Sequence, residues 1–417
     1  MLPAKTKHLN VYSFIARRLA FNQQRAFSRF IIRLSIGATV VSVMVMILAI
    51  AFSGGFQKTI SEKIFSFWGH IRIQNYETLR VSIAEETPIQ RQDSILQLKD
   101  KFPQIKTIQS FATKTAILKT TETIEGVMFK AIEEDYDFSN LNKFLVEGRW
   151  LNFSDSGYSD EINISASIAR RLKLNVNDKL LVYFIQPTGS PRPRRLTVTG
   201  IYSTGIEEYD KMIAVCDLKL VQRLNDWDEN QIGGYEIFLH NYKDMDFIKE
   251  EIYYELPLGL NSNSIKEINP NIFDWLALQN KTIYIVLAIM IAIAVLNLIT
   301  CLLILVLERT RMVGILKAVG ASSFSIQKIF LIQGAIITLS GILLGNVLAL
   351  LICYLQEKYG FITLPEDFYY ISKAAVSLKW WQVLLVDAGT LIVCTLVLLI
   401  PSYIVKKIQP VQAISFR

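Results

Sequence analysis

The chain has 417 residues, of which 51% are hydrophobic and 19% charged, and its mean hydropathy is +0.32. This composition is too apolar for an ordinary soluble protein and too charged for a chain lying wholly in a membrane, so it predicts membrane spans joined to a polar domain. The net charge is +7, but Lys and Arg are concentrated beside the apolar runs, which favours membrane topology over nucleic-acid binding. Three of the four cysteines lie in apolar runs, so the polar region has no disulfide framework.

The N-terminal region 1–29 combines basic residues with apolar positions at helical spacing. This pattern predicts an amphipathic helix on the inner membrane surface. Segment 30–53 is almost wholly apolar and long enough for a first span of a hydrocarbon core about 30 Å thick. Because basic residues precede it, we expect the N-terminus in the cytosol and the following residues outside.

Segment 54–281 is a polar insert large enough for two small domains. Strand-like runs occupy 70–75, 115–119, 123–132, 179–185, 195–202 and 235–239, and helical stretches occupy 94–102 and 244–256. Their order predicts an extracytoplasmic α+β unit built from both ends of the insert, 55–115 and 228–275, with a β-rich insert at 116–227.

Three further apolar runs predict spans at 282–307, 329–355 and 380–404, with an external loop at 356–379 and a cytoplasmic tail at 405–417. Both termini then lie inside, as the distribution of basic residues requires. The predicted fold is an α-helical membrane protein with four transmembrane helices and a large α+β extracytoplasmic domain between the first and second.

Small residues mark one side of the third predicted span, at Gly334, Gly341 and Gly345. The GxxxG pair predicts close helix packing, either within the subunit or across a dimer. Two polar residues also lie within spans. We expect Asn297 to hydrogen-bond another helix, and Asp387 to pair with a nearby cation or to stay solvated near the outer end.

Segment 308–328 joins the second and third predicted spans and carries an apolar stripe at i, i+3, i+4 and i+7. The stripe comprises Met312, Ile315, Leu316 and Val319. Basic residues lie off it, at Arg309, Arg311 and Lys317. Gly320 stands where a helix stop is expected. A short amphipathic helix between two spans is either a lever moved by a cytosolic partner or an interfacial helix that only makes the connection.

Within this segment, Glu308-Arg309-Thr310-Arg311 and Gly314 to Ser322 resemble the stretch after the second span in the FtsX-like permease family. These are the membrane subunits of LolCDE-type and MacB-type ABC transporters. The tail motif Pro410 to Ile414 is also similar, so the resemblance is dense in the membrane part and loose in the middle. Met312 departs from the family, which usually has an acidic residue there.

The resemblance implies that segment 308–328 is the coupling helix that docks on the ATPase. The coupling residues would be Glu308, Arg309, Arg311, Met312, Ile315, Leu316, Lys317, Val319 and Gly320. It also implies an ABC ATPase dimer and a second permease subunit, identical or paralogous, as partners in the bacterial inner membrane. ATP and Mg²⁺ would bind the ATPase, because this chain has no GxxxxGK[ST] phosphate loop. We therefore expect no enzyme activity and no catalytic, cofactor-binding or metal-binding residues.

The chain looks most like the LolC/LolE branch, which implies extraction of lipoproteins from the inner membrane, by mechanical transmission, towards the outer membrane. The implied ligands are lipoprotein cargo, membrane lipid and a periplasmic carrier, and no nucleic acid. A MacB-like efflux permease and an FtsX-like regulator of a cell-wall hydrolase remain alternatives. A membrane-anchored adhesion or sensor protein without an ATPase would have no obvious use for the segment between the spans.

Two further sites follow from the same resemblance. A proline-stiffened basic loop lies between two predicted strands and contains Pro187, Pro191, Arg192, Pro193 and Arg194. It is either an ordinary turn or a short version of the loop with which LolC-like permeases hold the carrier. A cavity for acyl chains between the first two spans would be lined by Met44, Phe52 and Met290, of which the methionines are adaptable.

Overall fold

The computed structural model describes residues 26–76, 87–120, 123–154, 157–186, 190–365 and 369–399. The chain divides into two compact units. Unit 1 comprises the chain up to Gln57, Leu276–Ile362 and the chain from Lys373, and unit 2 comprises Lys58–Trp275 with Thr363–Ser372. Most of the predicted N-terminal helix and the whole predicted tail 405–417 lie outside the described residues.

Unit 1 is built from long helices. They are α2 (Ala26–Trp68), α10 (Pro270–Glu308), α12 (Ser323–Tyr359) and α14 (Trp380–Val397), with the short α11 (Thr310–Ala318) between α10 and α12. Within the described part of the chain, the four long helices are long and apolar enough to cross a membrane. The first three extend beyond the predicted spans, because hydropathy reports the apolar part of a helix and not its polar continuation.

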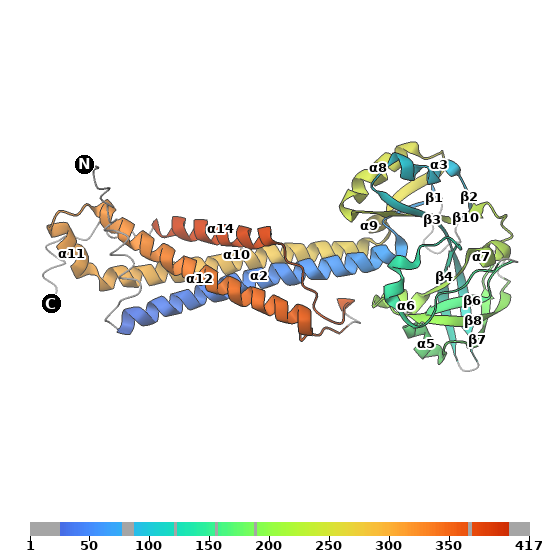
Figure 1. Cartoon of the computed structure of the whole chain (residues 1–417), viewed down its shortest axis with the longest axis horizontal. Coiled ribbons are helices and arrows are strands. Elements are labelled where there is room, and N and C mark those ends of the chain that lie inside the picture. The colour runs from blue at the N-terminus through green and yellow to red at the C-terminus, as the bar shows by residue number, and fades with distance from the viewer. Residues whose placement is uncertain are drawn as a thin grey trace, which may run out of the picture. The chain divides into compact units, whose positions relative to one another are not determined.

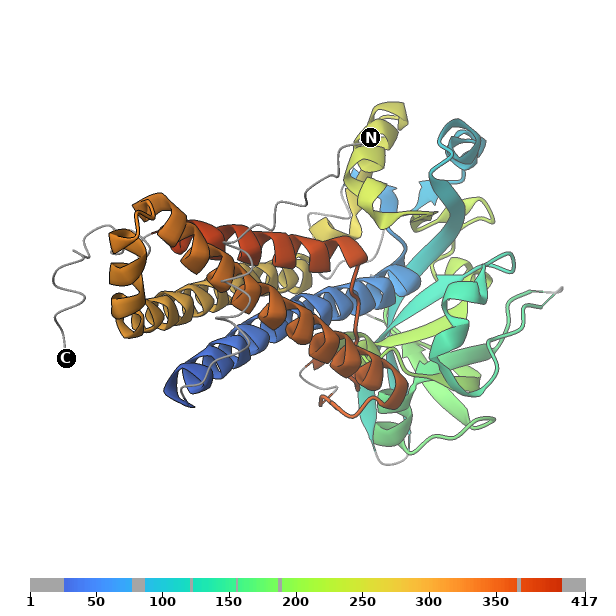
Figure 2. The same ribbon diagram turned by 60° about the vertical axis from the view of Figure 1, so that its left-hand side comes forward.

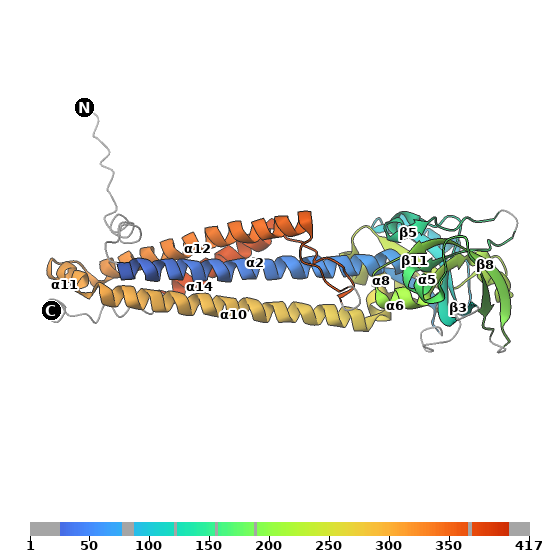
Figure 3. The same ribbon diagram turned by 90° about the horizontal axis from the view of Figure 1, so that it is seen from below.

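The glycine side of α12 packs inside the subunit. A Cβ added at Gly341 would lie 2.6 Å from the Thr39 Cβ of α2, and one at Gly345 would lie 3.0 Å from the Val43 Cβ. Glycine at these positions lets α12 approach α2 closely where the two helices cross (Figures 1 and 3). Gly334 faces Leu398, 2.5 Å from an added Cβ. Of the two predicted uses of this face, packing within the subunit is the one present.

Polar groups in the helices bond across helix pairs. Asn297 Nδ2 donates to the Ser35 carbonyl at 3.1 Å and to the Ser35 hydroxyl at 3.0 Å, so the predicted interhelical bond is confirmed. Asp387 accepts a hydrogen bond from Asn346 Nδ2 at 2.7 Å. Its partner is therefore a neutral amide, which corrects the expectation of a cation or solvent.

Among the described residues of unit 2, ten strands form one sheet, in the order β12-β1-β11-β3-β4-β9-β6-β8-β5, with β7 paired to β3 and β8. The bounds are β1 Ile71–Asn75, β3 Ile105–Lys119, β4 Ile124–Ile132, β5 Leu145–Gly148, β6 Glu161–Ser165, β7 Lys179–Phe184, β8 Arg192–Tyr202, β9 Ile213–Asp217, β11 Gly234–Leu239 and β12 Leu260–Ser264. A second pair is β2 Ile89–Gln90 with β10 Gln231–Ile232.

Short helices complete unit 2, which makes it the α+β domain that the sequence predicts. They are α3 Asp93–Leu96, α4 Leu98–Lys101, α5 Ala166–Leu172, α6 Glu207–Met212, α7 Leu218–Leu224, α8 Met245–Glu255 and α9 Ile265–Ile268. The 3-10 turns are η2 Phe138–Asn140, η3 Asn142–Phe144 and η4 Tyr242–Asp244.

Strand β3 joins the two predicted parts of the insert. Its first half pairs with β11, and its second half pairs with β4 and β7. The expected boundary between 115 and 116 falls inside this strand. Segments from both ends of the insert and from its middle therefore share one sheet.

A buried ion cluster of Arg72, Lys130 and Glu236 lies where α2 ends in unit 2. Glu236 accepts from Lys130 Nζ at 2.7 Å and from Arg72 at 3.1 Å, and the Lys130 and Glu236 side chains are fully buried. Lys130 Nζ also donates to the Phe67 carbonyl in the last turn of α2, a favourable place for a cation. Burial lowers the Lys130 pKa to about 8, and Glu236 opposes that shift.

Candidate coupling site

The short helix α11 is set between two long helices by a break at Arg309. Arg309 has non-helical angles (φ −102°, ψ 13°), and its N–H lies 3.2 Å from the carbonyls of both Leu305 and Val306. This bifurcated bond ends α10, and α11 begins at the next residue. Helix α11 lies where α10 ends and α12 begins, at one end of the helices (Figures 1 and 2).

The end of α11 is fixed by a glycine. Gly320 has φ +96°, and its N–H donates to the Lys317 carbonyl at 3.0 Å, while the Ala321 N–H donates to the Leu316 carbonyl at 2.9 Å. These two bonds form a Schellman motif, whose left-handed position favours glycine. Ser322 then caps α12 by accepting from the Ser325 N–H at 3.2 Å. The chain direction between α11 and α12 is thus set by local bonds.

One face of α11 packs on the helices of its own subunit. Val313 is fully buried, and Met312 and Leu316 pack on the same core cluster. That cluster includes Leu305 and Val306 at the end of α10, and Ile326 and Phe330 near the start of α12. This packing holds α11 to both neighbouring helices.

The other face of α11 leaves large apolar side chains in the open. Ile315 is 49% exposed and Val319 83% exposed, and they lie one helical turn apart. Leu307 at the end of α10 and Phe324 at the start of α12 are also exposed. Arg311 is exposed on the same short helix. Apolar exposure of this kind, beside a charge, is typical of an interaction site.

The single predicted stripe is therefore split. Met312 and Leu316 belong to the core of the subunit, whereas Ile315 and Val319 face outward. Periodicity cannot separate these roles, because the residues lie within one helical arc and a partner surface is as apolar as a core. The exposed Phe324 and Leu307 were not among the predicted residues. Glu308, Arg309 and Lys317 are partly exposed around this site.

The basic loop is shorter than predicted, because β8 begins within it. Pro187 lies outside the described residues, Pro191 is exposed, and β8 begins at Arg192. Pro193 pairs with Tyr183 of β7 in a part of β8 whose other edge has no strand partner among the described residues, where a missing N–H costs little. Arg192 binds Asp226 at 2.8 Å. Arg192, Pro193 and Arg194 are therefore strand residues, which corrects the loop assignment.

The methionines predicted to line an acyl-chain cavity pack on one cluster. Met44 of α2 and Met290 of α10 are partly buried against a group that includes Val43 and Ile47. Phe52 is partly buried. Both methionines therefore pack against the same apolar cluster.

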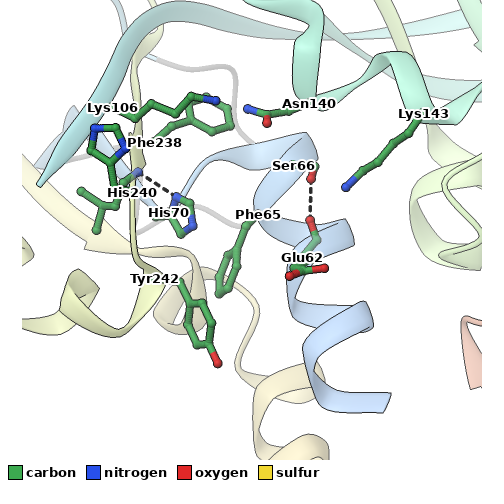
Figure 4. A pocket seen from close by; sticks show the side chains of 11 residues that line it. Glu62, Phe65, Ser66, His70, Lys106, Asn140, Lys143, Phe238, His240 and Tyr242 are labelled. Carbon is green, nitrogen blue, oxygen red and sulfur yellow. Dashed lines mark hydrogen bonds between the residues drawn. The ribbon is translucent and has the colours of Figure 1, made fainter. Parts of the chain in front are cut away.

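Unit 2 holds a pocket of about 460 Å³ at the end of α2 (Figure 4). His70 lines it, and its Nδ1 accepts from the Leu239 N–H at 3.1 Å, so the neutral ring carries its proton on Nε2. Burial, with help from Lys106, lowers the His70 pKa to about 4. This imidazole is a hydrogen-bonding group near neutral pH and not a proton carrier. In the described part of the chain, no group of three or more His, Cys, Asp or Glu side chains could hold a metal ion.

Known proteins match both units. Residues 34–240 match the MacB-like periplasmic core domain, and residues 284–410 match the FtsX-like permease C-terminal domain. The lipoprotein-releasing system transmembrane protein LolC of Xylella fastidiosa is 25% identical, over 96% of this chain and 97% of its own length. LolE of Haemophilus influenzae is 22% identical, over 89% of this chain and 91% of its own length.

Among solved structures, the periplasmic region of MacB from Actinobacillus actinomycetemcomitans aligns with 48% of this chain and 91% of its own length, at 14% identity and a TM-score of 0.33. The two domain matches within one chain, and relatives aligned over nearly its whole length, carry the assignment. The chain accordingly has the two domains of the FtsX-like, MacB-type permeases of ABC transporters, and it is similar to LolC and LolE over nearly its whole length.

Proposed function

We propose that the chain is the permease subunit of a lipoprotein-releasing transporter, acting by mechanical transmission. The relatives aligned over most of the chain are named as lipoprotein-releasing proteins, which supports this cargo over efflux. In this proposal α11 is cytoplasmic, both termini are cytoplasmic, and unit 2 is periplasmic. The ATPase is a separate chain, and a second permease subunit completes the complex.

The observation that carries the proposal is the exposed apolar face of α11. Ile315 and Val319 stand out from a helix whose opposite face is packed on its own subunit. A groove on an ATPase is the partner such a helix fits, because an amphipathic helix lays its apolar face into an apolar groove. Since the inner face is fixed to α10 and α12, displacement of α11 moves those two helices. Closure of the ATPase dimer on ATP would thereby drive lipoprotein out of the membrane towards a periplasmic carrier.

The test changes only the two apolar residues on the exposed face of α11. Ile315→Asp combined with Val319→Asp removes apolar side chains worth about 1.5 to 3 kcal/mol each when fully buried, so docking should weaken by at least roughly 100-fold. We expect the variant to insert and fold normally, yet to lose co-purification with the ATPase and ATP-dependent lipoprotein release. Both are measured on the complex reconstituted in proteoliposomes.

Two control variants sharpen the test. Arg311→Ala removes an exposed charge on the same helix and should cost at most about 1 kcal/mol of docking energy. Leu316→Ala removes part of the inner face and should lower thermal stability of the isolated permease, which the outward variant should not do. Normal ATPase binding by the Ile315/Val319 variant would contradict the docking role of α11.

A further inference from the structure

The loop between α12 and α14 does not stay with the helices that it joins. Thr363–Ser372 groups with unit 2, while the residues on both sides of it group with unit 1. We call its described residues, 363–365 and 369–372, the strap. The sequence predicts this segment only as part of a short external loop, 356–379. Its contacts link the end of α12 to residues of unit 2.

The base of the strap is tied to the end of α12. Gln356 is 2% exposed, and its Nε2 donates to the carbonyls of Ile362 at 3.2 Å and Ala374 at 2.9 Å. Its Oε1 accepts from the Ile362 N–H at 2.9 Å. The Ala374 N–H donates across to the Ile362 carbonyl at 3.0 Å. The buried Gln356 amide therefore holds the two chain segments at the base of the strap, at Ile362 and Ala374. The base is thus fixed to α12.

The far part of the strap is held by Tyr370. Its carbonyl accepts from Lys63 Nζ of α2 at 2.7 Å, and its hydroxyl donates to Glu208 Oε1 of α6 at 3.0 Å. Its ring meets Trp275 of α10 edge to face, with the centroids 5.9 Å apart. One residue thus contacts unit 2 at three separate places, all within Lys58–Trp275.

The backbone conformation of Tyr370 also indicates that its surroundings hold it in place. Its φ is +59°, a conformation that is uncommon for a residue other than glycine and persists when surrounding contacts enforce it. The next residue, Ile371, is 3% exposed. The strap is therefore docked at its far part as well as tied at its base.

We propose that the strap is a further load-bearing connection, through which α12 pulls on α6 of unit 2, and that Tyr370 is its positioning residue. Helices α2 and α10 run into unit 2 by chain continuity, because both contain residues of each unit. Helices α12 and α14 have no such continuation, and the strap supplies it. The proposal rests on the proposed function, since α12 directly follows the coupling helix α11.

The experiment measures hydrogen exchange in the full-length permease bound to its ATPase, with and without ATP. Tyr370→Phe keeps the ring and the carbonyl and loses only the hydrogen bond to Glu208. We expect backbone exchange in the strap to rise roughly three- to tenfold, the effect of losing one ordinary solvent-accessible hydrogen bond. We also expect the ATP-dependent change in exchange of α6 to disappear. Tyr369→Phe is the matched control, since Tyr369 is the exposed neighbour of Tyr370, and it should change neither readout.

A second variant tests the base. Gln356→Leu should leave Tyr370 docked but abolish the same ATP-dependent change in α6, because a loosened base no longer follows α12. An α6 response that survives in both variants would overturn the proposal, as would unchanged strap exchange in Tyr370→Phe. Failure of the wild-type permease to bind any ABC ATPase would instead contradict the proposed function, and the strap would still be tested by its exchange in the isolated permease.

Discussion

The end of α2 and the short helix α11 differ in how their side chains are covered. The end of α2, which we call the closed end, is covered within the chain, whereas α11, which we call the open end, leaves apolar side chains exposed. At the end of α2, Lys130 bonds the Phe67 carbonyl, and the ion cluster around Glu236 is buried. At α11, Ile315 and Val319 remain exposed although Val313 is fully buried. A helix end that is complete within one chain satisfies its polar groups internally. A helix that leaves large apolar side chains in the open needs a surface outside its own chain to cover them, which is lipid for the spans and, in the function proposed here, a partner protein for α11.

The largest effect that would sharpen this comparison is expected from Glu236→Gln. The change leaves Arg72 and Lys130 buried without a counter-charge, and breaking a buried ion pair costs about 3 to 5 kcal/mol. Urea unfolding of the full chain in detergent, followed by tryptophan fluorescence, measures the loss. Glu161→Gln is the matched control, because its partner Arg149 is half exposed, and it should cost no more than about 1 kcal/mol. Equal losses would mean that the end of α2 does not depend on the ion cluster.

A second effect at the closed end should depend on pH. The folded His70 has a pKa of about 4 against an ordinary value of 6.5. Between these values the unfolded chain binds a proton that the folded chain does not, so the free energy of unfolding should fall as pH falls from 6.5 to 4. The loss approaches about 3 kcal/mol at pH 4, since each pKa unit corresponds to about 1.4 kcal/mol.

The control for this effect is His70→Asn, which offers an oxygen acceptor to the Leu239 N–H but has no titrating group. Urea unfolding at several pH values should show a shallower decline for this variant than for the wild type. Parallel declines in both proteins would assign the pH dependence to other groups.

The smallest effect concerns the open end. Gly320→Ala should destabilise the link between α11 and α12 by about 1 kcal/mol, the usual cost of a left-handed position without glycine. An added Cβ there meets nothing within 4 Å, so the cost is conformational and not steric. Thermal unfolding of the permease, compared with Gly389→Ala, where a Cβ also meets nothing, checks it. If α11 is ordered by its partner alone, the two variants should behave alike.

Sequence reasoning recovered the features that depend on local pattern. Apolar runs located the four helices, and the spacing around Gly320 located the end of α11, because hydropathy and capping act over neighbouring residues. The interhelical bond of Asn297 was predicted because an amide in an apolar helix needs a partner.

Features that depend on distant residues were missed or misjudged. Lys130 lies on a strand whose two faces are both covered, so its burial has no local signal, and its partner Glu236 comes from another strand. The partition of the α11 stripe depends on Phe330 and Val306, which the period of a single helix does not contain. Tyr370 contacts Lys63, Glu208 and Trp275, all far from it in sequence. Nothing near Tyr370 distinguishes it from the adjacent Tyr369.

The glycine face of α12 has a consequence for assembly with a second permease. Because Gly341 and Gly345 are already covered by α2, the surface of α12 left for lipid or for another subunit consists of bulky side chains such as Leu343, Leu344 and Val347. Two such surfaces meet through interlocking side chains, at a wider axial separation than a glycine contact allows. Contacts of that kind tolerate exchange among leucine, valine and isoleucine. A paralogous partner could therefore diverge in sequence on this surface while the inner glycines stay fixed.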